Sequence, residues 1–229
     1  MIWLGKKSAF SLNAKEKKAC LALARKSIDY FFQHRDIWAP AEEELKGVPS
    51  KLKKEKACFV TLMIAEPEAS VGKGGSAGKG ASSGKKKKSF RGKKLRLRGC
   101  IGHLQSIQSL YKDIIENAVS AAFNDMRFSA LIEWELPRIK IEVSVLTDPE
   151  PLKYANSADL LKKIKEGKDG LIIKKGYFSA TFLPSVWEEL KSKEDFLSHL
   201  CAKAGLSPDE WRKGELEVQR YYAIKAKEK

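Results

Sequence analysis

The segment 139–145 alternates between apolar and polar side chains, and this pattern restricts the fold more than any other feature. Isoleucine or valine occupies every second position, with Lys140, Glu142 and Ser144 between them. Because successive side chains of a β-strand point to opposite faces, the alternation predicts a strand with one buried and one solvated face. Half-buried strands are typical of antiparallel sheets. We therefore expect an antiparallel sheet that is covered on one side.

Two predicted hairpins and the helices between them set the fold class. Residues 57–64 and 95–101 are β-like and would form the first hairpin, while residues 171–173 and 177–183 would form the second. Apolar stripes and capping residues predict helices over 13–34, 107–123, 157–166, 184–190 and 193–204, followed by a last strand over 216–224. Hairpin-linked strands with helices between them indicate an α+β fold, an antiparallel sheet flanked by helices, rather than a parallel doubly wound sheet.

The positive charge of the chain is concentrated in one segment. Residues 69–94 contain nine lysines and arginines and no acidic residue, which leaves only +6 of the total +15 for the rest. Their glycine, serine and lysine content cannot bury enough apolar surface to offset the entropy of ordering, so we predict a disordered basic loop. Such a loop could hold RNA weakly and in a salt-dependent way. It contains a single aromatic residue, Phe90, whereas single-strand binders offer several, so a solvated insertion is an equally good interpretation.

Length and composition suit a soluble domain. With 229 residues and 43% hydrophobic content, residues 1–229 could form one domain or two subdomains that share a core. No apolar run approaches the roughly 20 residues that span a bilayer, and residues 1–7 are too short for the apolar part of a signal peptide. We therefore expect a cytoplasmic protein without a membrane partner.

Cysteine and histidine positions give no local signature of a metal site. The four cysteines, at 20, 58, 100 and 201, lie far apart, and so do the three histidines. Wide spacing is unlike zinc motifs or small disulfide scaffolds, so free thiols are expected. A composite site that is assembled only by folding stays open.

Cys100 is the candidate with the strongest case for chemistry. On a regular strand it would share its polar face with Arg96, Arg98 and Gly102. The two arginines would favour the thiolate, the form that attacks electrophiles or binds metals. The glycines at 99 and 102 would leave room for a backbone or ligand. A structural strand cysteine is an equally good interpretation of the pattern.

Two other groups near this strand are ambiguous. His103 lies three residues after Cys100, so on a regular strand it faces the opposite side and is better explained as a structural residue, unless Gly102 forms a bulge. Asp125, Arg127 and Phe128 follow the long predicted helix in a connection, where binding residues often lie. A salt bridge at the end of the helix, with the aromatic ring in the core, is the simpler interpretation.

A longer pattern around Cys100 resembles a known family. The strand reads Leu97-Arg98-Gly99-Cys100-Ile101-Gly102, which is similar to the hallmark hexapeptide of the AMMECR-one domain family. Further similar blocks follow in the family's order, at 118–128, 135–137, 141–147, 169–173, 183–184, 194–197 and 203–206. The resemblance covers roughly residues 11 to 225.

This resemblance implies an α+β fold of two unequal, intertwined subdomains with a cleft between them. The positions characteristic of the family would be Arg98, Gly99, Cys100, Gly102, Asp125, Arg127 and Phe128. Segment 69–94 would be an insertion of this chain, and position 103 varies in the family. The family is linked with a Memo-type protein, a radical S-adenosylmethionine protein and RNA modification, but the resemblance implies no defined reaction or cofactor.

Three functions therefore compete. The first is an enzyme or enzyme subunit in which Cys100 is the nucleophile, Arg98 lowers its pKa and Asp125 with Arg127 positions a substrate. The second is a non-catalytic module in which the same face receives a ligand or a protein. The third is RNA binding through the charge of segment 69–94. The polar-face position of Cys100 and the matching hexapeptide slightly favour the enzyme.

Overall fold

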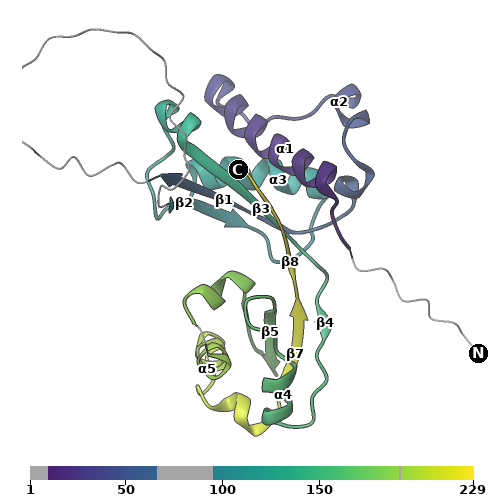
Figure 1. The fold of residues 1–229 in the computed structure, drawn as a ribbon, viewed down its shortest axis with the longest axis vertical. Helices are drawn as coiled ribbons and strands as arrows, with labels where there is room; N and C mark the ends of the chain where they lie inside the picture. Colours follow the sequence, from purple (N-terminus) through teal and green to yellow (C-terminus); the bar gives the residue numbers. More distant parts are fainter. Residues whose placement is uncertain (1–9, 66–94, 191) are drawn as a thin grey trace, which may run out of the picture.

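The computed structural model describes residues 10–65, 95–190 and 192–229, which form two lobes (Figure 1). The larger lobe contains an antiparallel sheet in the order β2 (Leu95–Gly102), β1 (Cys58–Ala65), β3 (Ile139–Leu146) and β8 (Ala223–Lys227). Its helices are α1 (Ala14–His34), α2 (Glu42–Lys46) and α3 (Leu110–Phe123), with short 3-10 helices at Ser50–Lys53 and Glu133–Arg138. Helices α1 and α3 pack side by side on one face of this sheet (Figure 1).

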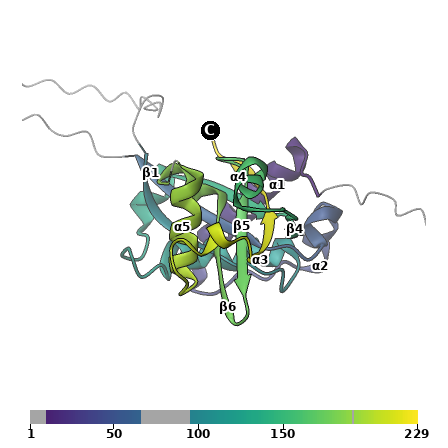
Figure 2. The same ribbon diagram turned by 90° about the horizontal axis from the view of Figure 1, so that it is seen from below.

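The smaller lobe contains the second antiparallel sheet. Its strands follow the order β4 (Glu150–Pro151), β7 (Glu217–Tyr221), β5 (Gly170–Lys175) and β6 (Phe178–Phe182). The helices of this lobe are α4 (Ser157–Lys163) and α5 (Lys193–Lys203), with 3-10 helices at Pro184–Glu188 and Glu210–Lys213. Seen from below, the smaller lobe lies in front of the larger one, and the β5–β6 hairpin extends away from the rest of its lobe (Figure 2). The predicted α+β fold of two unequal subdomains is confirmed.

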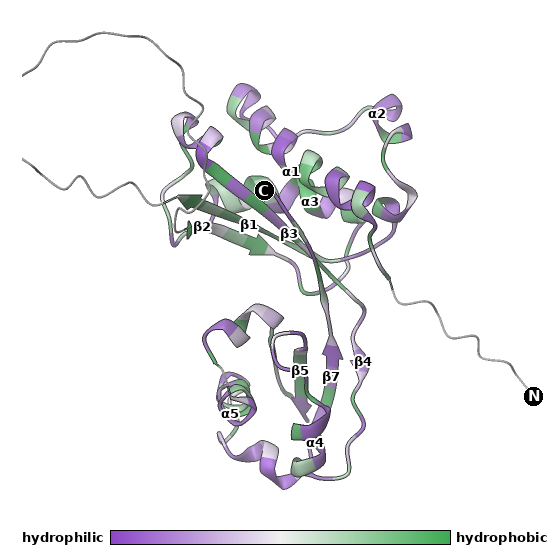
Figure 3. Ribbon diagram, viewed as in Figure 1, coloured by the Kyte–Doolittle hydropathy of each residue, from purple (hydrophilic) through white to green (hydrophobic). Residues whose placement is uncertain are grey.

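Alternation along β1 and β3 builds the core of the larger lobe. Val60 lies opposite Val143 and Leu62 lies opposite Ile141, and all four side chains are buried. The helices turn their apolar sides to this layer, and polar residues cover their other sides (Figure 3). The half-buried strand predicted over 139–145 is therefore confirmed.

The start of α1 is set by the capping box predicted from the sequence. The Glu16 backbone N–H donates to Asn13 Oδ1 at 2.9 Å, and the Asn13 N–H donates to Glu16 Oε2 at 2.7 Å. Both groups satisfy donors that the first helical turn leaves open. The helix therefore begins where the sequence predicts it.

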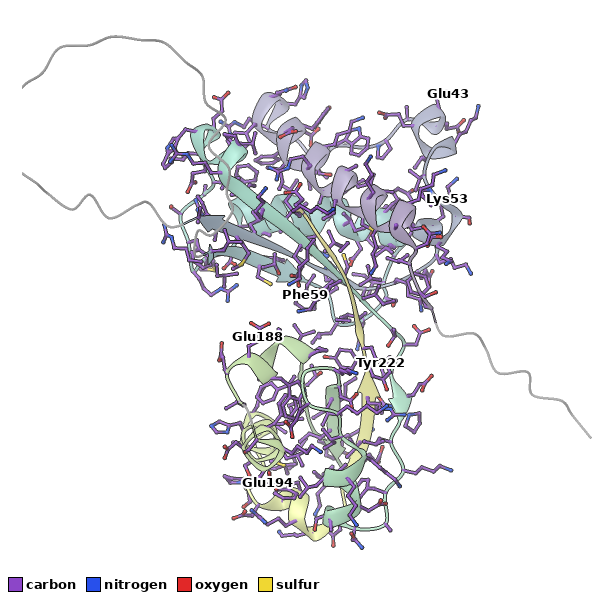
Figure 4. The ribbon with its side chains drawn as sticks, viewed as in Figure 1. Glu43, Lys53, Phe59, Glu188, Glu194 and Tyr222 are labelled. Carbon is purple, nitrogen blue, oxygen red and sulfur yellow. The ribbon has the colours of Figure 1, made fainter. Side chains whose placement is uncertain are left out.

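Two stretches of chain connect the lobes, one from β3 to β4 and one from β7 to β8 (Figure 1). They are hydrogen-bonded to each other: the Thr147 N–H donates to Tyr222 O, and the Tyr222 N–H donates to Thr147 Oγ1, both at 2.9 Å. Phe59 points from the larger sheet toward the smaller lobe (Figure 4) and packs with buried Leu146 and Tyr221. The lobes thus share a small apolar contact beside a double connection.

Two predicted elements differ from the structure. The strand expected over 216–224 is in fact two strands, β7 and β8, which belong to different sheets and meet at Tyr222. Both are extended, so the local pattern does not mark the change of sheet. The helix expected over 184–190 is a short 3-10 helix, Pro184–Glu188.

Membrane spans and the basic loop are the two remaining features that the sequence addresses. In that part of the chain, no helix is both long and apolar enough to cross a membrane. The predicted disordered loop 69–94 lies outside the described residues, and its disorder stays a prediction.

Candidate functional site

Cys100 lies in β2 and is the one cysteine of the four that is not buried. It pairs with Thr61 of β1 across the sheet, and its Sγ lies 3.1 Å from Thr61 Oγ1. Thr61 in turn pairs with Glu142 of β3, so the three residues form a row across the sheet. The thiol is therefore half-exposed in a polar row, as the sequence predicts for its face.

Asp125 and Arg127 hold the backbone of Cys100. The Cys100 N–H donates to Asp125 Oδ2 at 2.8 Å, and Arg127 Nη2 donates to Cys100 O at 3.1 Å. Among the described strands, β2 forms one edge of its sheet. An edge strand leaves N–H and C=O groups unpaired, and here a carboxylate and a guanidinium bond to them instead of another strand. The structure thus brings the three predicted site residues together through the main chain of Cys100.

Asp125 and Arg127 also form a two-pronged ion pair. Arg127 Nε lies 2.9 Å from Asp125 Oδ1, and Nη2 lies 2.7 Å from Oδ2. The hydrogen bonds from Arg127 lower the pKa of the buried Asp125 carboxyl to about 2, although burial opposes this shift. Phe128 is half-buried, with its ring centroid 5.6 Å from the Arg127 guanidinium carbon. The opposite charges largely cancel, which fits the simpler interpretation of a salt bridge after the helix.

Arg98 does not share a face with Cys100, and this expectation is wrong. The β1–β2 register shifts between Leu62 and Met63, so a bulge at Arg98 removes the regular alternation. The Arg98 guanidinium is buried and bonds to Glu135 Oε1 at 2.9 Å through Nε and to Oε2 at 2.7 Å through Nη2. It also donates to the carbonyl oxygens of Ser129 and Ala130. Arg98 therefore anchors the connection between α3 and β3.

The Cys100 thiol has a raised pKa, against the expectation of a stabilised thiolate. Burial is the largest cause, because it disfavours the charged form. The hydrogen bond with Thr61 and the charge of Arg127 lower the pKa by less, and Asp125 and Glu142 raise it further. The thiol is therefore protonated near neutral pH in the structure.

Gly99 and Gly102 are explained by packing within the protein. A Cβ at Gly99 would collide with the Ala121 carbonyl oxygen of α3. A Cβ at Gly102 would collide with Cys58 O and with the Phe59 ring. The close approach predicted at these glycines occurs, but the groups that approach are a helix backbone and a side chain of the neighbouring strand.

His103 pairs with Asp113 of α3, with its Nδ1 at 2.6 Å from Asp113 Oδ1. Asp113 is buried and also accepts a hydrogen bond from the Cys58 N–H at 2.7 Å. His103 therefore faces α3 and not Cys100, as strand parity predicts, and its structural role stays a prediction. Within the described ranges, no three His, Cys, Asp or Glu side chains gather as a group that could hold a metal ion.

A cavity of about 620 Å³ lies between the two lobes, where the family resemblance implies a cleft, but the residues that line it were not predicted. Its wall in the smaller lobe includes Ile172, Thr181 and Gln219, which form a row across β6, β5 and β7. Its wall in the larger lobe includes Leu146 and the loop that carries Gln105. These residues are far apart in sequence and share no motif. Cys100, Asp125 and Arg127 do not line this cavity.

Relatives of the chain share its sequence over long stretches. The AMMECR1 family model matches residues 21–226. A protein of Thermofilum pendens is 34% identical over 215 residues, which cover 93% of this chain and 89% of that protein. Protein MJ0810 of Methanocaldococcus jannaschii is 43% identical over 128 residues, which cover 56% of this chain and 64% of that protein.

A solved structure shares the fold. The crystal structure of the uncharacterized protein PH0010 from Pyrococcus horikoshii matches with a TM-score of 0.69 and 29% sequence identity, over 94% of this chain and 93% of that one. The family match spans nearly the whole described fold, including the hexapeptide of β2 and both lobes. The chain therefore belongs to the AMMECR1 family.

Proposed function

We propose that this protein is a non-catalytic ligand-binding module whose ligand occupies the cavity between the lobes. The single observation that carries the proposal is the cavity itself. Its volume of about 620 Å³ lies within the range of roughly 300–1,000 Å³ that is usual for small-molecule sites. Elements of both lobes contribute to its walls, as in many sites at domain interfaces.

The lining of the cavity favours a small polar molecule with one apolar side. Leu146 and Ile172 supply an apolar surface. The Thr181 hydroxyl is already bonded to Leu171 O and to the Tyr221 hydroxyl, so it has little capacity left. The exposed amides of Gln105 and Gln219 can each donate and accept hydrogen bonds. Asp148 and Lys203 also line the cavity, but they are already bonded to Lys56 Nζ and to Thr181 O, respectively. The amides therefore remain open to a ligand, and they suit an uncharged hydrogen-bonding group.

A screen with a library of polar fragments by ligand-observed NMR tests this proposal. Gln219→Trp would fill the cavity from an exposed strand position, and Glu217→Trp is the matched control on the same strand outside the cavity. We expect fragments that bind the wild type and Glu217→Trp but not Gln219→Trp. Fragments that bind Gln219→Trp as well as the wild type would contradict the proposal.

A second candidate is covalent chemistry at Cys100. It is favoured by the half-exposed thiol, which contacts a hydroxyl and lies close to the Arg127 charge. It is opposed by the raised pKa of the thiol and by the engagement of Arg98 with Glu135. A nucleophilic Cys100 would therefore need a substrate that itself lowers the thiol pKa.

The partners implied by the family resemblance stay predictions. They are a Memo-type protein, a radical S-adenosylmethionine protein and RNA, with RNA modification as the implied process. Cytoplasmic localisation likewise stays a prediction. In a complex with these proteins, a binding module would be the subunit that holds a ligand for an enzymatic partner. Purification of this protein from its source cell together with its bound partners would test this arrangement.

A further inference from the structure

A second cavity, of about 540 Å³, lies on another side of the segment that joins the lobes. It shares Thr147 and Asp148 with the first cavity, but its other walls differ. The larger lobe contributes three lysines from the segment before β1, and the smaller lobe contributes Arg220 of β7. Cations from both lobes therefore face one cavity.

Two of these cations have acidic partners. Lys56 is buried, and its Nζ lies 2.5 Å and 2.6 Å from the two carboxylate oxygens of Asp148. Lys51 Nζ lies 3.3 Å from Glu16 Oε2. The charges of these two lysines are therefore largely balanced by the protein itself.

The other two cations, Lys54 and Arg220, form no ion pair with an acidic residue among the described residues. In the part of the chain that the structure describes, neither side chain has a hydrogen bond or a salt bridge. Arg220 lies 5.9 Å from the centre of the Tyr222 ring. Burial raises the pKa of the Asp169 carboxyl, and the charge of Arg220 lowers it in part without forming an ion pair with it. Glu150 stands opposite Arg220 in the β4–β7 register without forming an ion pair with it. Two cations at one cavity repel each other, and an anion between them would remove this repulsion.

We propose that this cavity binds a small molecule through a phosphate group, which Lys54 and Arg220 hold from opposite lobes. A guanidinium matches phosphate with two parallel hydrogen bonds, and a lysine adds a point charge. Glu150 faces the same cavity and weakens anion binding by repulsion. This site is distinct from the proposed amide-lined cavity, so either proposal can fail without the other.

Calorimetric titration of the full chain with inorganic pyrophosphate tests the site. About 0.15 M salt should be present, because it screens weak binding to exposed lysines. Arg220→Gln and Lys54→Gln should each weaken binding by about tenfold, the effect of losing one charge-assisted contact. Lys53→Gln, the exposed neighbour outside the cavity, should leave the affinity unchanged.

Glu150→Gln provides a change of opposite sign, because removing a negative charge should tighten pyrophosphate binding. Because this variant is expected to gain affinity, a loss of folded protein cannot produce the result. Equal affinities of wild type, Arg220→Gln and Lys54→Gln would overturn the proposal. So would the absence of saturable binding by the wild type up to about 10 mM pyrophosphate.

Discussion

Asp125 accepts hydrogen bonds from the Cys100 backbone and from the Arg127 side chain, so at neutral pH its buried carboxyl is ionised in the folded protein. Its pKa of about 2 in the fold lies below its ordinary value. A group with a lowered pKa contributes stability above its unfolded pKa, and this contribution is lost as the pH falls through the folded pKa. The carboxylate should therefore stabilise the protein at neutral pH and stop doing so in acid.

Asp125→Asn should reduce the free energy of unfolding at pH 7 by about 2 kcal/mol. This is roughly the free energy that corresponds to lowering the pKa of Asp125 from its ordinary value to about 2. The difference from wild type should shrink as the pH falls from about 4 to about 2, because the wild-type carboxyl is then protonated. Urea unfolding at several pH values measures this. A difference that stays constant with pH would show that the charge of Asp125 has no part in it.

A free cysteine thiol has a pKa of about 8.5. We expect Cys100 to react with iodoacetamide mainly above this pH. The reason is that burial raises the pKa of its thiol. Mass spectrometry of the alkylated protein across a pH series gives the midpoint for Cys100, and Cys100→Ser identifies the background from the buried cysteines. A midpoint below about 7 would instead support the nucleophile hypothesis.

For single residues, the sequence predicts where a side chain lies better than it predicts whether that side chain is ionised. Parity separates Cys100 from His103 correctly, because the pairing of β2 with β1 is regular from Cys100 to Gly102, the residue before His103. Parity fails for Arg98, because the bulge depends on the pairing with β1 and because the buried partner, Glu135, lies beyond α3 in the sequence. The pattern shows which charges are near in sequence, whereas the pKa of Cys100 depends on burial and on groups from other elements.

Strand β2 and helix α3 lie so close that one glycine fixes their distance. Gly99 places no side chain toward α3, and a Cβ there would meet the Ala121 carbonyl oxygen inside contact distance. A backbone carbonyl cannot move aside as a flexible side chain can. The hexapeptide of the family thus has a packing role in this strand.

Gly99→Ala should lower the free energy of unfolding by about 3 kcal/mol, the upper part of the range for overpacked cores. Gly47→Ala is the matched control, because its φ of −77° is open to alanine and its only close atom, Glu44 O, lies 3.5 Å away. It should change stability by less than about 1 kcal/mol. Equal effects of the two substitutions in urea unfolding would contradict the packing role of Gly99.

Helices and strands in which apolar residues recur at regular spacing are predicted well from the sequence. The strand over 139–145 and the capped helix from Asn13 appear as expected, because each follows from neighbouring residues alone. The division of the last strand into β7 and β8 was not predictable, since it depends on where the two sheets lie. The cleft between the lobes was expected from the family resemblance, but its lining residues were not predictable for the same reason.

The two lobes are joined by a pair of hydrogen-bonded connections. Beside these connections lie one cavity with exposed amides in its wall and a second cavity that cations of both lobes face. Both cavities contain residues of both lobes. Ligands in either cavity would therefore stabilise the arrangement of the lobes by mass action.

Segment 69–94 lies outside the described residues, and the residues that line the two cavities come from other parts of the chain. Deletion of this segment should remove most salt-dependent binding to RNA, because it contains nine of the basic residues and no acidic one. Fragment binding between the lobes should be unchanged. RNA titrations at several salt concentrations measure the first effect, and an unchanged salt slope after deletion would rule out RNA binding through this segment.

The affinity of one cavity ligand for wild type, Gln219→Trp and Cys100→Ser distinguishes a binding site between the lobes from a site at the cysteine. If the protein is a binding module with its site between the lobes, Gln219→Trp should weaken binding by at least about tenfold, and Cys100→Ser should leave it unchanged. Loss of binding in Cys100→Ser with full binding in Gln219→Trp would contradict the account and place the function at the cysteine.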